Sequence, residues 1–463
     1  MTLIQNGKRL AKWRHNIERQ LDIAERIAFL DNRQKDFLYA DLRLIFPETY
    51  AQMVNFALCL PTTQEIIEEI SMIFQEPPTI TLPDDEELEE NLDQMLKKSR
   101  LGIVLNDVNK LVNLTNMVGV MPVYRDGRVD LDVLTGDNLF VTQSDADPTQ
   151  AEAVYYQYGI VEDSPTKAES ICKYVKLTAD TVSFVEINAH TGEIANETDV
   201  EYHGYNQIPI AWFTNTVQTN TFWPTKDCPV VECNRKQNIV ATDKMLALNM
   251  TVPTYYQTTS QESTDSGTVI GRLGVINLPM EYGGGQASCG YVQPDWTIDK
   301  MDAAIEEMKV VVGLAYGINP DTLRSKGGSA FSSGYQMRLA QQTLMNRINK
   351  EKWFYLESIE ELIRLMMACS TMNNDKSFSN AESMRILVDL APITFDESPI
   401  DTLDYLERLV MANIISPAEA KRIISGSEMS TDEAMEQIKQ NKEMKEELRG
   451  GIDPLDQTEA LND

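Results

Sequence analysis

The chain has 463 residues, of which 42% are hydrophobic, so two or three domains with sizeable cores are expected and global disorder is disfavoured. Its formal net charge is −30, and a surface this acidic repels phosphate groups, which disfavours a simple DNA- or RNA-coating role. The same charge suits a protein that lets DNA slide past without adhering.

The six cysteines are scattered, which predicts reduced thiols in a cytosolic compartment. Cys228 and Cys233 are poor candidates for a metal site, because the chain has only three histidines and no second cysteine pair. The basic, polar start is unlike a signal peptide, and no apolar run reaches the length of a membrane span. We therefore expect a protein that is soluble and intracellular when made and has no membrane partner.

Helical periodicity dominates the first part of the chain. Apolar residues at spacings of three and four predict helix over residues 8–45. Thr62 and Glu65 have the spacing of a capping box for the next helix. The acidic run that begins at Asp84 is expected to open a further helix that continues to Thr115.

The pattern then changes to the period of two that is typical of strands. Asp126-Gly127 is predicted to turn a hairpin. The segment 208–213 is a last strand, and Pro209 places it at an edge or a bulge. Helices followed by a meandering sheet indicate the α+β class. Further strands are predicted at 138–142, 153–160, 171–177 and 181–188.

Two helices bracket a small β insert in the middle of the chain. They are predicted at 229–250 and 298–313, and residues 251–295 between them are rich in Gly, Thr and Tyr. The second helix has a nearly heptad apolar seam for packing against helices of the same or a neighbouring subunit. The seam consists of Ile298, Met301, Ile305, Met308 and Val312.

A loop over residues 319–333 feeds a very long helix that ends near Cys369. Pro320 and the pair Gly327-Gly328 argue against helix or strand in this loop. A buried strand is predicted at 384–390, and helices follow residue 399. Ser416 and Glu419 form a capping box there, with Pro417 at the first helical position.

No catalytic, cofactor or metal site is predicted. The glycines at 285–290 have the spacing of a phosphate-binding loop, but Tyr291-Val292 stands where Lys and Ser or Thr are required. The segment 330–334 resembles a nucleophile elbow but no strand precedes it. His15, His190 and His203 have no recognisable nucleophile partner. We expect a non-enzymatic protein without cofactors.

This order of parts resembles the portal proteins of tailed double-stranded-DNA bacteriophages. The segment Ile208-Pro-Ile-Ala-Trp-Phe-Thr-Asn215 is similar to the family's short apolar strand before the stem. The segment Ser329-Ala-Phe-Ser-Ser-Gly-Tyr-Gln-Met-Arg-Leu339 is similar to its small-residue junction at the start of the long helix. The resemblance covers nearly the whole chain as an arrangement.

The resemblance implies a division of the chain and a set of partners. Portal proteins form dodecameric rings at a capsid vertex of the virion, are assembled in the host cytoplasm, and conduct the genome during packaging and ejection. The implied partners are other copies of the chain, double-stranded DNA in transit, the major capsid protein, the terminase large subunit and a neck or adaptor protein. The implied parts are a wing (1–226 and 334–398, the latter with the long helix), a stem (227–251 and 296–318), a clip (252–295), a tunnel loop (319–333) and a helical crown and tail (399–463).

Two sets of residues become candidates for contact with DNA. Arg324 and Lys326 supply cations to the tunnel loop, where they could touch phosphate transiently. Charged residues of the second stem helix could face the channel, although a solvated outer surface predicts the same charges. The loop residues are Arg324, Lys326, Gly327, Gly328 and Ser329, and the stem candidates are Lys300, Glu306, Glu307 and Lys309.

Two alternatives stay open on the residues alone. The chain could be a cytosolic hydrolase or transferase whose carboxylates form no recognisable motif. It could also be another structural component of a virion. A kink in the long helix is implied by the resemblance only, because no Pro or Gly marks one.

Overall fold

The computed structural model divides the chain into two compact units, Met1–Lys326 with Thr343–Ile393, and Gly327–Gln342 with Thr394–Asp463. Each unit is described by itself. The described residues are 3–83, 86–161, 171–198, 200–224, 227–250, 254–259, 275–279, 289–292, 298–324, 334–373, 378, 385–392, 406–411, 415–425, 433 and 435–441.

The predicted helical segment 8–45 consists of two helices. α1 spans Leu3–Leu30 and α2 spans Lys35–Ile45. Asn32 between them has a φ of 57°, a left-handed conformation that ends a helix without needing glycine. The short helices α3 (Tyr50–Met53) and η1 (Val54–Phe56) follow.

The capping box predicted for α4 (Thr62–Ile70) is wrong. Pro61 is the N-cap, and no side chain caps the helix. The Thr63 hydroxyl instead donates a hydrogen bond to Asn234, on a helix far along the chain. The polar side chains at the start of α4 therefore form tertiary hydrogen bonds instead of the predicted capping bonds.

A second predicted continuous helix is also divided. α5 (Glu86–Ser99) and α6 (Leu101–Thr115) are separated by Arg100, whose φ is 56°. Asp84 and Asp85 of the acidic run lie outside the described residues. α6 contributes Leu105, Val108 and Val112, none of them exposed, to the largest hydrophobic core.

The hairpin at Asp126-Gly127 is confirmed. β2 (Met117–Arg125) pairs antiparallel with β3 (Arg128–Thr135), and both turn residues have positive φ, at 51° and 77°, as a type I′ turn requires. β10 (Ala211–Thr214) pairs with β2 in a sheet of order β10-β2-β3, so the strand after Pro209 is an edge strand, as predicted.

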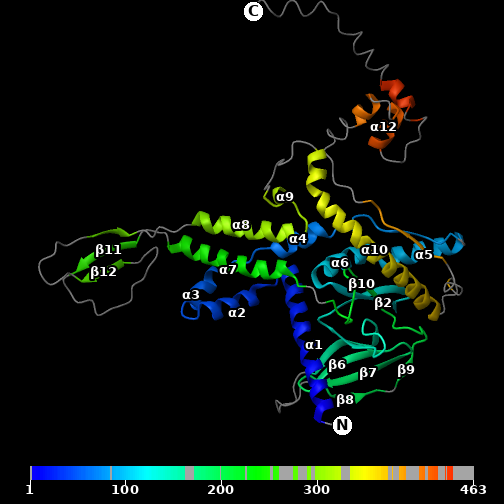
Figure 1. Cartoon of the computed structure of the whole chain (residues 1–463), viewed down its shortest axis with the longest axis horizontal. Helices are drawn as coiled ribbons and strands as arrows, with labels where there is room; N and C mark the ends of the chain where they lie inside the picture. Colours follow the sequence, from blue (N-terminus) through cyan, green and yellow to red (C-terminus); the bar gives the residue numbers. More distant parts are fainter. Residues whose placement is uncertain are drawn as a thin grey trace, which may run out of the picture. The chain divides into compact units, whose positions relative to one another are not determined.

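A larger antiparallel sheet follows, and its strands confirm the predicted series. The largest core packs the helices against one face of the three-stranded sheet, and a second cluster lies between the two sheets. Trp13 of α1 lies in a third cluster on the other face of the larger sheet. Figure 1 shows α1 running past this sheet. The strand order of the larger sheet is β4 (Leu139–Gln143), β5 (Ala151–Val161), β6 (Ile171–Leu177), β7 (Thr181–Asn188) and β8 (Ile194–Glu197), and β9 (Glu201–Tyr202) also pairs with β7.

The helices that bracket the β insert are confirmed. α7 spans Pro229–Met250 and α8 spans Ile298–Ala315, and the two lie side by side (Figure 1). Between them in the sequence, β11 (Thr254–Thr259) pairs parallel with β12 (Val275–Pro279) and antiparallel with β13 (Cys289–Val292).

Two predictions about the following segment need correction. Residues expected to be loop form the short helix α9 (Pro320–Arg324), because proline is compatible with the first helical position. The strand β14 (Leu387–Asp389) is not buried: Leu387 is 40% exposed, and among the described strands β14 pairs with β1 (Thr79–Thr81) alone. The long helix is confirmed as α10 (Gly334–Met372).

In the second unit, α12 (Pro417–Ser425) begins with the predicted capping box. The backbone N–H of Glu419 donates to the Ser416 hydroxyl at 3.2 Å, and the Glu419 carboxylate accepts from the Ser416 N–H at 2.7 Å. These hydrogen bonds hold the pKa of Glu419 below its ordinary value. Residues 406–411 and 435–441 are also helical.

Candidate functional site: the paired helices α7 and α8

α7 presents a row of buried polar side chains to the segment before α4. Asn234, Asn238 and Thr242 are at most 1% exposed, and their spacing of four residues places them on one helix face. The Asn238 side-chain oxygen accepts from the Leu60 N–H at 2.8 Å, and the Thr242 hydroxyl accepts from the Leu58 N–H at 3.2 Å. We call these three side chains of α7 and their partners the polar ladder.

Asn234 makes the densest contacts of the ladder. Its side-chain oxygen accepts from the Thr63 N–H at 3.0 Å and from the Thr63 hydroxyl at 2.9 Å, and its Nδ2 donates to the Leu60 carbonyl at 3.0 Å. Gln34 completes the ladder by donating to the same carbonyl and accepting from Asn238, both at 2.8 Å. Any slip of α7 would leave buried polar groups unpaired, so the ladder fixes the rotation and register of α7.

Fewer bonds join α8 to α7. The Gln237 side-chain N–H donates to the carbonyl of Ile305 at 2.8 Å, and Cys233 Sγ lies 3.4 Å from the carbonyl of Met308. An ion pair between Lys244 and Asp302 joins the two helices at the surface. Within the apolar seam that the sequence predicts on α8, Val312 is buried and Ile298, Met301, Ile305 and Met308 are partly buried.

The end of α8 is closed by a Schellman motif. Gly317 has a φ of 85°, the Ile318 N–H donates to the Gly313 carbonyl at 2.9 Å, and the Gly317 N–H donates to the Leu314 carbonyl at 3.0 Å. Gly313 also allows α9 to approach, since a Cβ there would lie 2.1 Å from Leu323 Cδ1. The chain therefore reverses sharply between α8 and α9.

α10 contacts this end of α8 at Tyr316, which is 6% exposed. Arg347 of α10 donates to the Tyr316 carbonyl at 3.1 Å, and its guanidinium lies 5.0 Å from the ring centroid. The same guanidinium pairs with Glu351 at 2.8 Å. Burial raises the pKa of Tyr316, so its hydroxyl stays neutral. A cation at a helix C-terminus is also favoured by the helix dipole.

The structure describes some of the predicted DNA-contact residues. Lys300 and Glu307 of α8 are exposed, and Glu306 is partly buried. Lys309 donates to Glu65 of α4 at 2.6 Å, so its ammonium is paired within the chain. Arg324 is the last residue of α9, and its side chain lies outside the described atoms together with the whole of Lys326, Gly327, Gly328 and Ser329.

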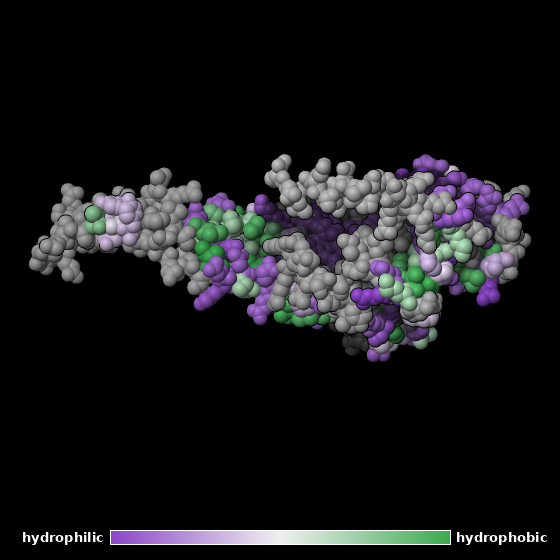
Figure 2. All heavy atoms as spheres, turned by 90° about the horizontal axis from the view of Figure 1, so that it is seen from above, coloured by the Kyte–Doolittle hydropathy of each residue, from purple (hydrophilic) through white to green (hydrophobic). Residues whose placement is uncertain are grey.

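Both helices also expose apolar side chains. On α8, Val311 is 59% and Leu314 is 54% exposed, and on α7 Met245 is 39% and Leu248 is 41% exposed. Figure 2 shows hydrophobic residues gathered over the part of the molecule where α7 and α8 lie. Apolar side chains that gather on exposed helices are typical of interaction surfaces.

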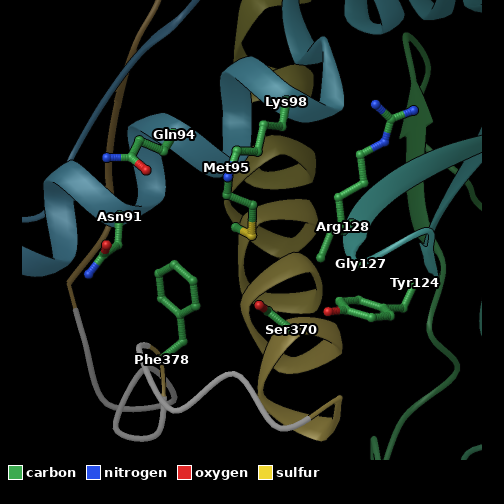
Figure 3. Close-up of a pocket in the computed structure, with 10 residues that line it drawn as sticks. Asn91, Gln94, Met95, Lys98, Tyr124, Gly127, Arg128, Ser370 and Phe378 are labelled. Atoms are coloured by element: carbon green, nitrogen blue, oxygen red, sulfur yellow. The ribbon is translucent and has the colours of Figure 1, made fainter.

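A pocket lies away from the paired helices, between α5, the β2–β3 hairpin and the end of α10 (Figure 3). Met95 and Phe378 contribute apolar groups to it, and the Tyr124 side chain points toward the end of α10 that carries Ser370. The described residues that line it include no carboxylate, histidine or cysteine. The charged lining residues are Lys98 and Arg128.

A search for other chemistry covers only the described part of the chain. No group of three His, Cys, Asp or Glu residues there could hold a metal ion. All six cysteines are free thiols. No helix within the described ranges has both the length and the hydropathy needed to cross a bilayer.

Solved structures of gene transfer agent (GTA) particles are among those similar to this chain. Neither the family models nor the curated proteins give a match. The chain is similar to a chain of "Neck of empty GTA particle computed with C6 symmetry" with a TM-score of 0.42 and 13% identity, covering 82% of this chain and 94% of that one.

The other two structures are "Neck of native GTA particle computed with C12 symmetry" and "Virion of native gene transfer agent (GTA) particle". Their TM-scores are 0.40 and 0.39, each at 12% identity over 82% of this chain, and the matches cover 93% and 94% of those chains. TM-scores at this level do not establish a shared fold family.

Proposed function

We propose that this chain is a portal protein, the subunit of a ring at a capsid vertex through which double-stranded DNA is packaged and ejected. In this proposal α7 and α8 form the stem, the β11–β13 module forms the clip, and residues 319–333 form the tunnel loop. The wing holds the stem, and residues 399–463 form the crown. The major capsid protein, the terminase large subunit and a neck or adaptor protein are the proposed partners.

One observation carries the proposal: two antiparallel helices bracket a small sheet and are fastened at the other end to the wing. The polar ladder anchors α7 to the segment before α4, and Arg347 of α10 holds the end of α8. Helices that hold the β11–β13 sheet in a fixed position need a rigid attachment of this kind. This arrangement favours a mechanical role over a catalytic one.

The exposed apolar side chains support ring formation. A closed ring uses a heterologous contact, in which one surface of each subunit meets a different surface of the next. Val311 and Leu314 of α8 and Met245 and Leu248 of α7 supply apolar surface on the two helices. Burying these groups between neighbouring stems would gain about 25 cal/mol per Å² of apolar surface.

The acidic balance supports DNA passage. A net charge of −30 per chain repels phosphate, which weakens adhesion along a channel wall. Lys300, Glu306 and Glu307 remain the proposed channel-facing charges of α8. Lys309 is a weaker candidate than these, because its ammonium is paired with Glu65.

The direct test is the assembly state of the purified full chain, measured by native mass spectrometry and negative-stain microscopy. We expect a ring of many subunits. A monomer or dimer at every concentration, with no ring under any condition, would contradict the proposal. The double variant Val311→Glu and Leu314→Glu should abolish the ring without unfolding the subunit, whereas Leu21→Glu, at a 65% exposed position of α1, should not.

The tunnel loop has a separate test. Deletion of Gly327–Ser329 should leave rings intact and impair DNA packaging or retention in assembled particles. Loss of folding in the deletion variant would instead assign this segment a purely structural role.

A further inference from the structure

The two edges of the larger sheet differ in how far other parts of the chain cover them. At the β4 edge, α1 lies close and its polar side chains occupy backbone acceptors. The Leu139 carbonyl accepts from Arg19 at 2.6 Å and from Gln20 at 3.1 Å, and the Gly136 carbonyl accepts from Arg19 at 2.9 Å. Covering an edge in this way prevents another strand from adding to it.

The opposite edge, formed by β8 and β9, has no such cover among the described residues. β8 pairs with β7, no described element pairs with its other side, and all four of its residues are exposed. Figure 1 shows β8 at the margin of the sheet. β8 also contains no Lys or Pro, two residues with which sheet edges are commonly protected from pairing.

Apolar side chains surround this open edge. Ile194 of β8 is 50% and Tyr202 of β9 is 84% exposed, and Val200 between the two strands is 52% exposed. On β7, Phe184 is 47% exposed and contacts Tyr158 of β5 edge to face, with ring centroids 5.7 Å apart. A strand added here would therefore find apolar contacts as well as backbone groups.

Carboxylates outnumber cations in the sequence around the edge. Between Lys176 and Lys226 the sequence has no Lys or Arg, but it has six carboxylates. The two nearest cations of β6 face carboxylates of the sheet: the Lys176 ammonium bonds Glu197 at 3.0 Å, which lowers the pKa of that carboxyl, and Lys173 lies opposite Glu186 in the β6–β7 register. The six carboxylates are Asp180, Glu186, Glu193, Glu197, Asp199 and Glu201.

We propose that the β8–β9 edge binds an extended, basic segment of a partner protein in which apolar residues alternate with Lys or Arg. The segment adds a strand beside β8, so its backbone pairs with the open edge. Its apolar side chains contact the exposed residues around β8, and its cations meet the carboxylates. β8 and β9 are short, so the side-chain contacts carry much of the affinity. The proposal does not depend on ring formation.

The test is fluorescence anisotropy with the full chain and a labelled peptide, Thr-Lys-Val-Arg-Val-Lys-Thr. We expect saturable binding. Ile194→Lys removes an apolar contact, adds a repelling charge and should weaken binding about tenfold, which corresponds to about 1.4 kcal/mol. Glu201→Lys, at an exposed position of β9, should weaken it in the same direction. Leu21→Lys, at an apolar site on α1 that is 65% exposed, should leave binding unchanged.

Two control peptides separate the parts of the proposal. A peptide with Glu in place of Lys and Arg should not bind, and one with Pro in place of both Val residues should bind at least tenfold more weakly. Equal binding of the proline peptide would overturn strand addition, and equal binding of the wild type and both edge variants would overturn the site. Self-association of the chain that Ile194→Lys abolishes would also overturn the proposal, by assigning the edge to a second copy.

Discussion

α7 and α8 are neighbours of similar length, and both form ion pairs, those of α7 joining Arg235 to Glu25 and Asp41. They differ in the buried neutral hydrogen bonds that α7 adds. α7 turns uncharged amide and hydroxyl side chains inward, and these bond backbone groups of the segment 58–63. α8 is joined to its surroundings by Gln237, by surface ion pairs through Asp302 and Lys309, and by the grip of Arg347 on its last turn. The buried ladder fixes the position of α7 over several turns. The strongest contact of α8 is at its C-terminal end, so we expect the rest of that helix to move more easily.

The largest expected effect breaks the ladder itself. Asn234→Ala removes the acceptor of two Thr63 donors and leaves them buried without partners, which should lower the free energy of unfolding by about 3 kcal/mol. The midpoint of urea unfolding, followed by tryptophan fluorescence, measures this. Lys236→Ala, at an exposed position on the same helix, is the control and should shift stability by no more than about 0.5 kcal/mol. Equal effects of the two variants would refute the ladder as an anchor.

A smaller effect is expected at the end of α8. Arg347→Met keeps the aliphatic part of the side chain but leaves Glu351, which is 7% exposed, without its cation, and it removes the bond to the Tyr316 carbonyl. We expect a loss of about 2 kcal/mol. Hydrogen exchange should also rise in residues 312–324 and stay unchanged in α7. A matched rise in α7 would show that the two helices are not held separately. Arg364→Met, at a more exposed pair on the same helix, is the control.

The smallest effect concerns a carboxylate of α7. Burial raises the pKa of Asp243 above its ordinary value of 3.8, so its folded form binds a proton more readily than its unfolded form. Its unfavourable contribution is absent below pH 3.8 and appears as the pH rises through the folded pKa. Asp243→Asn should therefore stabilise the protein at pH 7 by about 0.3 kcal/mol, since the half-exposed group is screened, and should have no effect at pH 3.5.

Asp302→Asn is the comparison on α8, because that carboxylate is paired with Lys244. It should be neutral or slightly destabilising at pH 7. If both variants shifted stability in the same direction, burial would not distinguish the two carboxylates.

The sequence predicted the regular elements well where local chemistry decides them. The helix at 229–250, the type I′ turn at Asp126-Gly127 and the capping box at Ser416 each depend on residues close together in the chain. The breaks at Asn32 and Arg100 were missed because neither is a glycine or proline. The short helix α9 was missed because Pro320 was taken as a breaker rather than as a first helical residue.

The ladder was also missed, although its pattern is in the sequence. Asn234, Asn238 and Thr242 are four residues apart, as polar residues on a solvated helix face also are. The tertiary contact with the segment 58–63 is what makes this row of polar side chains buried rather than solvent-exposed. Thr62 and Thr63 show the same limit, because Thr63 bonds to Asn234, which is 171 residues further along the chain.

The uncharged character of the ladder has a consequence for work in concentrated salt. At 1 M salt the Debye length falls to about 3 Å, which screens exposed ion pairs such as those of Lys244 and Lys309. Hydrogen bonds between buried neutral groups are not screened in this way. At high salt, α7 should therefore keep its hydrogen bonds to the segment 58–63, whereas its ion pairs through Arg235 and the surface ion pairs of α8 should weaken. The two helices would differ in their tolerance of ionic strength.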